Sequence, residues 1–147
     1  MVRMAAAAKV IFVLLLFVAA GCSGFSKSDR EDLIKQLGET ADTFNKFFKW
    51  TDFDSAAAFV DPKSMENYAR WAADHEDRFM AESYQIMTCM LEDPNATKPP
   101  FDAKVVVKFK GVVILPEANR RDYVWTQKWT YQANGWMIRP EFSVFEH

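Results

Sequence analysis

The chain has 147 residues, of which 50% are hydrophobic and 15% aromatic, and this composition excludes a disordered chain and predicts one folded domain. Its formal net charge of −2 at pH 7 excludes the basic footprint of a nucleic-acid-binding protein.

The first 21 residues are typical of a bacterial export signal. Arg3 and Lys9 precede an apolar run over residues 10–20, and small residues follow it. As a helix this run would span about 16 Å, roughly half of the hydrocarbon core of a bilayer. We therefore interpret residues 1–21 as a signal peptide that is removed, not as a membrane-spanning anchor.

The end of this segment, Ala19-Ala20-Gly21-Cys22, resembles the lipobox of bacterial lipoproteins, although Ala19 stands where that family most often has Leu. The resemblance implies that Cys22 receives diacylglycerol, that cleavage occurs just before it, and that the new amino terminus is acylated. Several acyl chains would anchor the protein stably. Ser23 implies, by the same resemblance, export to the outer membrane, with the domain facing the periplasm. The alternative is an ordinary secreted protein in which Cys22 is a free thiol.

Removal of the signal peptide changes the charge and the cysteine inventory. From Cys22 onward, 16 Lys and Arg face 20 Asp and Glu, which gives a formal net charge of −4. With Cys22 lipidated, Cys89 has no disulfide partner, and the apolar run 86–91 around it predicts a buried, inert thiol. Residues 22–27 form a short linker, so the domain that we predict over residues 28–147 would lie close to the bilayer.

Three helices are predicted between residues 28 and 79. Ser28 and Glu31 fit a capping box, and apolar residues spaced by three and four follow as far as about residue 50. A second, shorter helix is capped by Thr51 or Asp52, and Asp61-Pro62 starts a third. One face of the third helix carries Met65, Tyr68, Trp71, Ala72, His75 and Phe79.

From about residue 80 the apolar residues alternate, which predicts strands. We expect four antiparallel strands, over residues 82–91, 103–115, 122–132 and 136–144. Helices followed by an antiparallel meander predict an α+β domain in which N-terminal helices pack on a curved sheet.

The last hairpin is predicted in more detail. Asn134-Gly135 favours a two-residue turn, so Ala133 should pair with Trp136 and Tyr131 with Ile138. One face then collects the aromatic and apolar side chains and packs against the helices. The other face is polar and faces solvent: Thr126, Lys128, Thr130, Gln132, Met137 and Arg139.

Three helices before a bent antiparallel sheet, with Asp61-Pro62 and the closing Gln127-x-Trp129 and Asn134-Gly135-Trp136, resemble the nuclear transport factor 2-like superfamily. The resemblance implies that a long curved sheet wraps the first helix into a cone whose open end is a pocket. Members include ketosteroid isomerases, polyketide cyclases, dehydratases, dimerisation domains and secretion accessory proteins. The fold alone therefore does not choose a function.

Six residues are candidates for the lining of that pocket: Tyr68, Trp71, His75, Trp125, Gln127 and Trp129. Gln127 is the polar member of an aromatic stripe, and a buried amide needs hydrogen-bond partners. It either bonds to a helix backbone or a tryptophan indole, or contacts a ligand between tryptophan walls. Tyr68 and His75 are either a donor pair at the mouth of the cone or ordinary packed residues.

Catalysis of the isomerase type needs a carboxylate base and an acid in one apolar pocket. The predicted inner face of the first helix supplies neither, while the third helix could supply Asp61, Tyr68 and His75. We therefore predict no catalytic residue and no cofactor. We also predict no metal site, because Asp74-His75-Glu76-Asp77 would splay around a helix instead of converging.

The sequence therefore predicts an envelope lipoprotein that acts without catalysis as a binding or assembly module. The alternative is a small-molecule isomerase or dehydratase that uses the pocket of the cone. The expected partners are the membrane, through the lipid anchor, and a protein, an apolar small ligand or a second copy of the chain.

Overall fold

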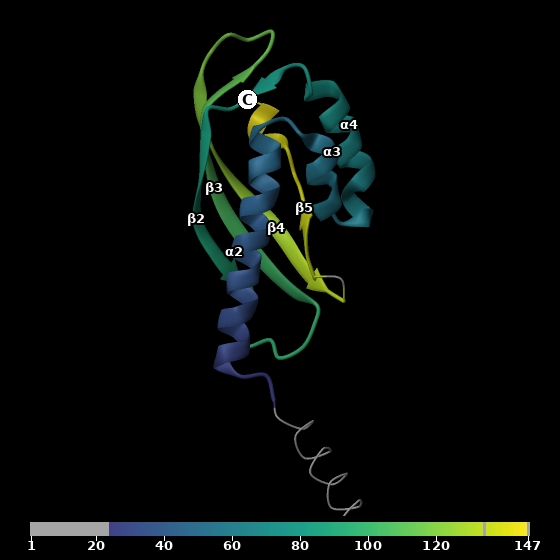
Figure 1. Ribbon diagram of the computed structural model, residues 1–147, viewed down its shortest axis with the longest axis vertical. Helices are drawn as coiled ribbons and strands as arrows, with labels where there is room; N and C mark the ends of the chain where they lie inside the picture. Colours follow the sequence, from purple (N-terminus) through teal and green to yellow (C-terminus); the bar gives the residue numbers. More distant parts are fainter. Residues whose placement is uncertain (1–23, 134, 147) are drawn as a thin grey trace, which may run out of the picture.

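One long helix, α2 (Lys27–Lys49), lies across a face of a curved antiparallel sheet, as Figure 1 shows. The computed structural model describes residues 24–133 and 135–146. Four shorter helical elements follow α2: α3 (Phe53–Ala56), the 3₁₀ helices η1 (Ala57–Phe59) and η2 (Pro62–Ser64), and α4 (Met65–His75). They lie on the same side of the sheet as α2.

The sheet has five strands, one more than predicted: β1 (Phe79–Met80), β2 (Ser83–Leu91), β3 (Phe101–Ile114), β4 (Arg121–Gln132) and β5 (Gly135–Arg139). β1 and β2 both pair with β3, and β4 lies between β3 and β5. All of these pairs are antiparallel. The α+β class is confirmed, but Phe79 belongs to β1, where it pairs with Ile114, and not to the third helix.

The start of α2 differs from the prediction by two residues. Its N-cap is Ser26, whose hydroxyl accepts a bond from the backbone N–H of Asp29, while the Asp29 carboxylate accepts from the Ser26 N–H at 2.8 Å. This capping box replaces the predicted one at Ser28 and Glu31. Both pairs satisfy the same spacing, but Phe25 stacks on Phe101 with ring centroids 5.2 Å apart and so fixes the entry of the chain. The helix thus begins inside the predicted linker.

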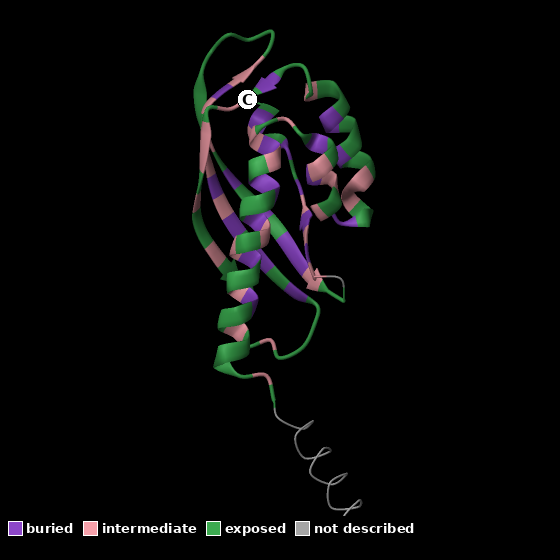
Figure 2. Cartoon of the chain, viewed as in Figure 1, coloured by how far each residue is buried: buried purple, intermediate pink, exposed green. Residues whose placement is uncertain are grey.

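The apolar stripe of α2 faces the sheet, and the inner side of the sheet is buried beneath it (Figure 2). The buried residues of the helix are Leu33, Leu37, Ala41, Phe44, Asn45 and Phe48. Ile34, which the pattern places on this stripe, is half-buried because Leu33 takes the inner position. The helix ends at Lys49 with Trp50 as its C-cap, in agreement with the predicted end near Trp50.

Two irregularities in the strands accompany the curvature of the sheet. The register between β2 and β3 shifts at Met87, and that between β3 and β4 shifts between Phe109 and Val112. Gly111 lies in the second shift with a φ of 63°, a conformation that glycine adopts without strain. Bulges of this kind bend a strand and increase its twist.

The register of the last hairpin differs from the prediction by two residues. Tyr131 pairs with Trp136, and Gln132 pairs with Gly135, so the connection consists of residues 133 and 134. Asn134 itself lies outside the described residues. Because the displacement is an even number, every side chain keeps its predicted face. Thr130 is nevertheless buried on the outer face, where it borders a small cavity together with Asp61 and Pro62.

The C-terminal segment is not the long strand that we predicted. β5 ends at Arg139, and a 3₁₀ helix, η3 (Ser143–Glu146), follows Pro140. Proline has no N–H to donate to a strand ladder, which explains the early end. The segment then turns over the sheet and buries Phe142 and Phe145.

Phe48 lies at the centre of the core and is fully buried. Rings from α2, α3, α4, three strands and the C-terminal segment surround it: Phe44, Phe53, Trp71, Phe79, Phe109, Trp125, Phe142 and Phe145. We call the space between α2, α4 and the sheet the cone interior. None of the helices within the described residues has the length and apolarity needed to cross a membrane.

Candidate functional site

The cone interior holds five of the six residues predicted to line a pocket. Tyr68, Trp71, Trp125, Gln127 and Trp129 are each at most 7% exposed. Phe142, which the sequence pattern assigned to a strand, lies parallel to Trp71 with centroids 4.2 Å apart and also contacts Trp125. Side chains of the protein itself therefore occupy the space around these residues.

Gln127 is buried in a polar network that joins the sheet to α2. Its amide nitrogen donates to Asn45 Oδ1 at 2.7 Å, and the Trp129 indole donates to Gln127 Oε1 at 3.1 Å. Asn45 Nδ2 donates to the Ala41 carbonyl at 2.8 Å and lies 3.3 Å from Gln127 Oε1. The expected bond to an indole is present, so the amide of Gln127 is satisfied without a ligand.

Sequence reasoning missed Asn45. The signal that could have found it is its position four residues after Ala41 and one after Phe44, on the buried stripe of α2. A polar residue on that stripe requires a buried partner, and Gln127 is the polar residue on the facing stripe of β4.

Tyr68 and His75 both use their polar atoms within the fold. The Tyr68 hydroxyl donates to the Phe53 carbonyl at 2.6 Å, and His75 Nδ1 lies 2.8 Å from the Trp71 carbonyl. The His75 ring also stacks on Trp71 with centroids 4.0 Å apart. Burial, and then the negative charges of Asp54 and Asp52, raise the pKa of Tyr68 above its ordinary value, so its hydroxyl stays protonated at neutral pH.

Asp61 connects the helical region to β5. Its carboxylate accepts from the backbone N–H of Lys63 at 3.2 Å and from Arg139 Nε at 2.7 Å. Burial raises the pKa of Asp61, but the bonds from Arg139 and Lys63 and their positive charges lower it more, and the net pKa is below its ordinary value. Asp61 is thus an ionised cap, which disfavours its use as a proton acceptor near neutral pH.

Two of the predicted pocket residues border cavities. His75 contributes to a cavity of about 330 Å³ at the end of the cone, between α4, the β3–β4 connection and η3. We call it the mouth cavity, and its polar lining includes Arg78, Glu117, Asn119 and Glu146. Trp129 borders a cavity of about 120 Å³ with Lys128 and Arg139. Tyr68, Trp71, Trp125 and Gln127 line neither of these cavities.

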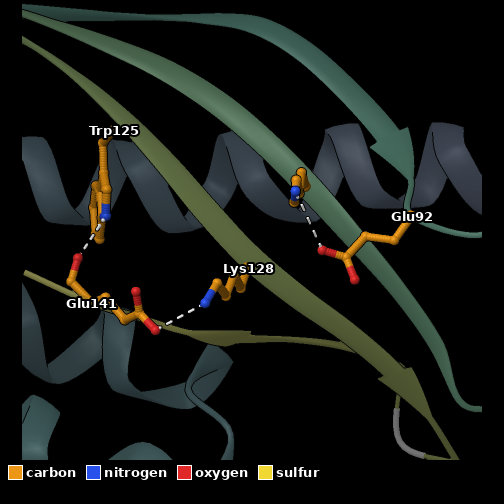
Figure 3. A network of polar contacts seen from close by, with 5 residues as sticks. Glu92, Trp125, Lys128 and Glu141 are labelled. Atoms are coloured by element: carbon orange, nitrogen blue, oxygen red, sulfur yellow. Dashed lines mark hydrogen bonds and ion pairs between the residues drawn. The ribbon is translucent and has the colours of Figure 1, made fainter.

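Ion pairs lie on the outer face of the sheet. Lys128 Nζ lies 3.0 Å from Glu141 Oε1, and the Trp125 indole donates to the Glu141 carbonyl at 2.9 Å. Figure 3 draws both contacts as dashed lines. Lys104 pairs with Glu92 at 3.8 Å. The Trp125 bond attaches the C-terminal segment to β4, whereas the two ion pairs are exposed to solvent and contribute little to stability.

The remaining sequence predictions concern cysteine, metal and the export signal. Cys89 is half-buried against the core, and burial raises the pKa of its thiol. Among residues 24–133 and 135–146, no cluster of three or more His, Cys, Asp or Glu side chains is suited to hold a metal ion. The predicted signal peptide, residues 1–21, and the predicted lipidation site Cys22 lie outside the described residues.

No family model matches the chain, and no curated protein matches it. Its fold is similar to that of a crystal structure from Campylobacter jejuni, described as a "putative NTF2-like transpeptidase". The two share 14% identity over 69% of this chain and 95% of the other, with a TM-score of 0.44. A likeness of this size assigns no activity. The arrangement of helices against a curved antiparallel sheet agrees with the predicted nuclear transport factor 2-like cone.

Proposed function

We propose that the protein is a lipoprotein of the bacterial cell envelope that acts as a non-catalytic binding or assembly module. The observation that carries the second part is the filled cone interior. Aromatic side chains occupy it, and its buried amides bond to one another and to an indole. A ligand would have to displace these core side chains. We therefore expect partners to bind on the outer surfaces of the domain and in the cavities at the edges of those surfaces.

The proposed anchor rests on the sequence Ala19-Ala20-Gly21-Cys22 and on the basic and apolar segments before it. The start of the folded domain is consistent with a short tether. Phe25 packs on Phe101 and lies three residues after Cys22, which corresponds to at most about 10 Å of extended chain. The lipid would therefore hold the first turn of α2 and the start of β3 close to the bilayer.

This tether would direct the mouth cavity away from the membrane. α2 has 23 residues and is about 35 Å long, and the β3–β4 connection and η3 lie at the end of the molecule opposite its first turn (Figure 1). A protein in the outer membrane would then present the mouth cavity to the periplasm. Its mixed lining of Arg78, His75, Glu117 and Glu146 is suited to polar contacts with a protein partner.

Cell fractionation with radioactive palmitate tests the anchor. We expect the wild-type chain to be labelled and to sediment with membranes, and Cys22→Ser to lose the label and to become soluble without a change in its circular dichroism spectrum. Cys89→Ser is the matched control, because it removes the other cysteine and should keep both the label and the membrane location. Palmitate that persists in Cys22→Ser would refute the proposed anchor.

A further inference from the structure

A groove on the side of α2 lies outside the pocket that the sequence predicts. It has a volume of about 440 Å³, within the range of small-molecule sites, and separates α2 from η1 and from the β4–β5 hairpin. We call it the lateral groove. Its lining residues are Gln36, Glu39, Thr40, Ala58, Phe59, Tyr131, Gly135, Trp136 and Met137.

The lining of the lateral groove combines aromatic rings with one negative charge. Phe59, Tyr131 and Trp136 come from three different elements, and Glu39 is the ionisable carboxylate among residues that include no Lys, Arg or His. Glu39 is exposed, and no ion pair joins its carboxylate to another residue of the part that the structure describes. In this it differs from Glu66, Glu82, Glu92 and Glu141, each of which faces a cation.

Two of the aromatic side chains are held in place before any ligand binds. The Trp136 indole donates to the Leu33 carbonyl of α2 at 3.0 Å. Tyr131 meets the Trp136 ring edge to face, with centroids 5.3 Å apart. A preorganised aromatic wall loses little conformational entropy on binding, which favours affinity for a small ligand.

We propose that the lateral groove binds a small organic cation with a substituted ammonium group. Aromatic rings attract such a cation through their quadrupole, and the exposed Glu39 carboxylate, which has no ion-pair partner within residues 24–133 and 135–146, supplies the opposite charge. The amide of Gln36 and the hydroxyl of Thr40 provide hydrogen-bond partners for polar substituents of the ligand. The site does not depend on the proposed lipid anchor or on the mouth cavity.

The test is a titration of the ¹⁵N-labelled full chain in detergent with choline, followed through the Trp136 indole N–H signal. That signal is assigned by its absence in Trp136→Phe. We expect a saturable shift with a dissociation constant in the millimolar range or tighter. The isosteric alcohol 3,3-dimethylbutan-1-ol has the same shape without the charge, and we expect it to bind at least about tenfold more weakly.

Two variants separate charge from shape. Glu39→Gln should weaken choline binding about fivefold and leave the binding of the neutral alcohol unchanged. Glu31→Gln, an exposed acid on the same helix that does not line the groove, is the matched control and should leave both affinities unchanged. Circular dichroism verifies that each variant folds. Since both substitutions are on the exposed surface of α2, we expect each variant to retain the wild-type fold.

Three results would overturn the proposal. One is the absence of a saturable shift up to about 50 mM choline, far above the expected dissociation constant. Another is equal affinity for choline and the neutral alcohol, which would make the groove an apolar site and not a cation site. The third is an unchanged choline affinity in Glu39→Gln.

Discussion

The cone interior and the lateral groove use the same types of residue in opposite ways. In the interior, Phe48 and Trp125 contact other rings of the protein, and Gln127 bonds to Asn45 and Trp129. In the groove, Tyr131 and Phe59 are half-buried, and Glu39 has no ion-pair partner among the described residues. The amides of the interior are therefore satisfied by the protein itself, although the Trp71 indole N–H is buried there without a hydrogen-bond partner. The Glu39 carboxylate of the groove is instead exposed to solvent.

This difference shows that an aromatic-rich cone is not by itself a ligand pocket. What distinguishes a core from a site is whether the polar atoms among the rings already have partners. The amides of the interior meet this criterion for a core, and we propose that the surface carries the interactions of the protein. Substitutions test this distinction, from the largest expected effect to the smallest.

Phe48→Ala should have the largest effect on stability. It removes the central ring of the interior and leaves a cavity, so we expect a loss of about 3–5 kcal/mol in the free energy of unfolding. Phe59→Ala, in the lateral groove, should lose about 1 kcal/mol, because this ring is half-buried. Urea denaturation followed by circular dichroism measures both. Equal losses would contradict the distinction between core and groove.

Gln127→Leu should cost about 1–3 kcal/mol, because it leaves Asn45 Oδ1 and the Trp129 indole N–H buried without these partners. Adding Asn45→Leu should restore part of the loss, and a double-mutant cycle by urea denaturation measures this coupling. Gln132→Leu, exposed on the same strand, is the control and should change stability by at most about 0.5 kcal/mol. Additive losses would show that the network is not cooperative.

Asp61→Asn tests the connection to β5. At neutral pH we expect a loss of about 1 kcal/mol, because Arg139 is 40% exposed and solvent screens the pair. Since folding lowers the pKa of Asp61 below its ordinary value of 3.8, the ionised carboxylate stabilises the fold above that value, and this stabilisation is lost as the pH falls through the folded pKa. The stability difference between wild type and variant should therefore shrink below about pH 4 in thermal unfolding scans. A difference that is constant with pH would contradict the assignment of an ionised cap.

Lys104→Ala should have the smallest effect, below about 0.5 kcal/mol in urea denaturation. Its pair with Glu92 has a distance of 3.8 Å and both side chains are more than 40% exposed. A loss above about 1 kcal/mol would mean that the outer face of the sheet contributes more to stability than its exposure predicts.

Local patterns predicted most of the fold. The stripe of α2, the Asp61-Pro62 helix start and the alternation in residues 82–132 each depend on neighbours a few positions away in sequence. The hairpin register could not be fixed in this way, because pairing Tyr131 with Trp136 instead of Ile138 keeps every side chain on its face.

The candidate sites were less predictable because they depend on tertiary contacts. The alternation in residues 136–144 resembles a strand, but Phe142 and Phe145 gain more burial by turning into the cone interior. The lateral groove combines Glu39, Phe59 and Tyr131, which come from separate elements. No spacing in the sequence indicates that these three residues lie together.

Native mass spectrometry of the purified full chain, compared with the same sample denatured, tests the central claim that the protein fills its own cone. We expect the mass of the processed chain alone, without a bound ligand, in both states, since Phe142 and Phe145 occupy the interior beside Trp71. A stoichiometric apolar molecule that is present in the native sample and lost on denaturation would contradict the claim that the protein fills its own cone. The cone interior would then be a ligand pocket.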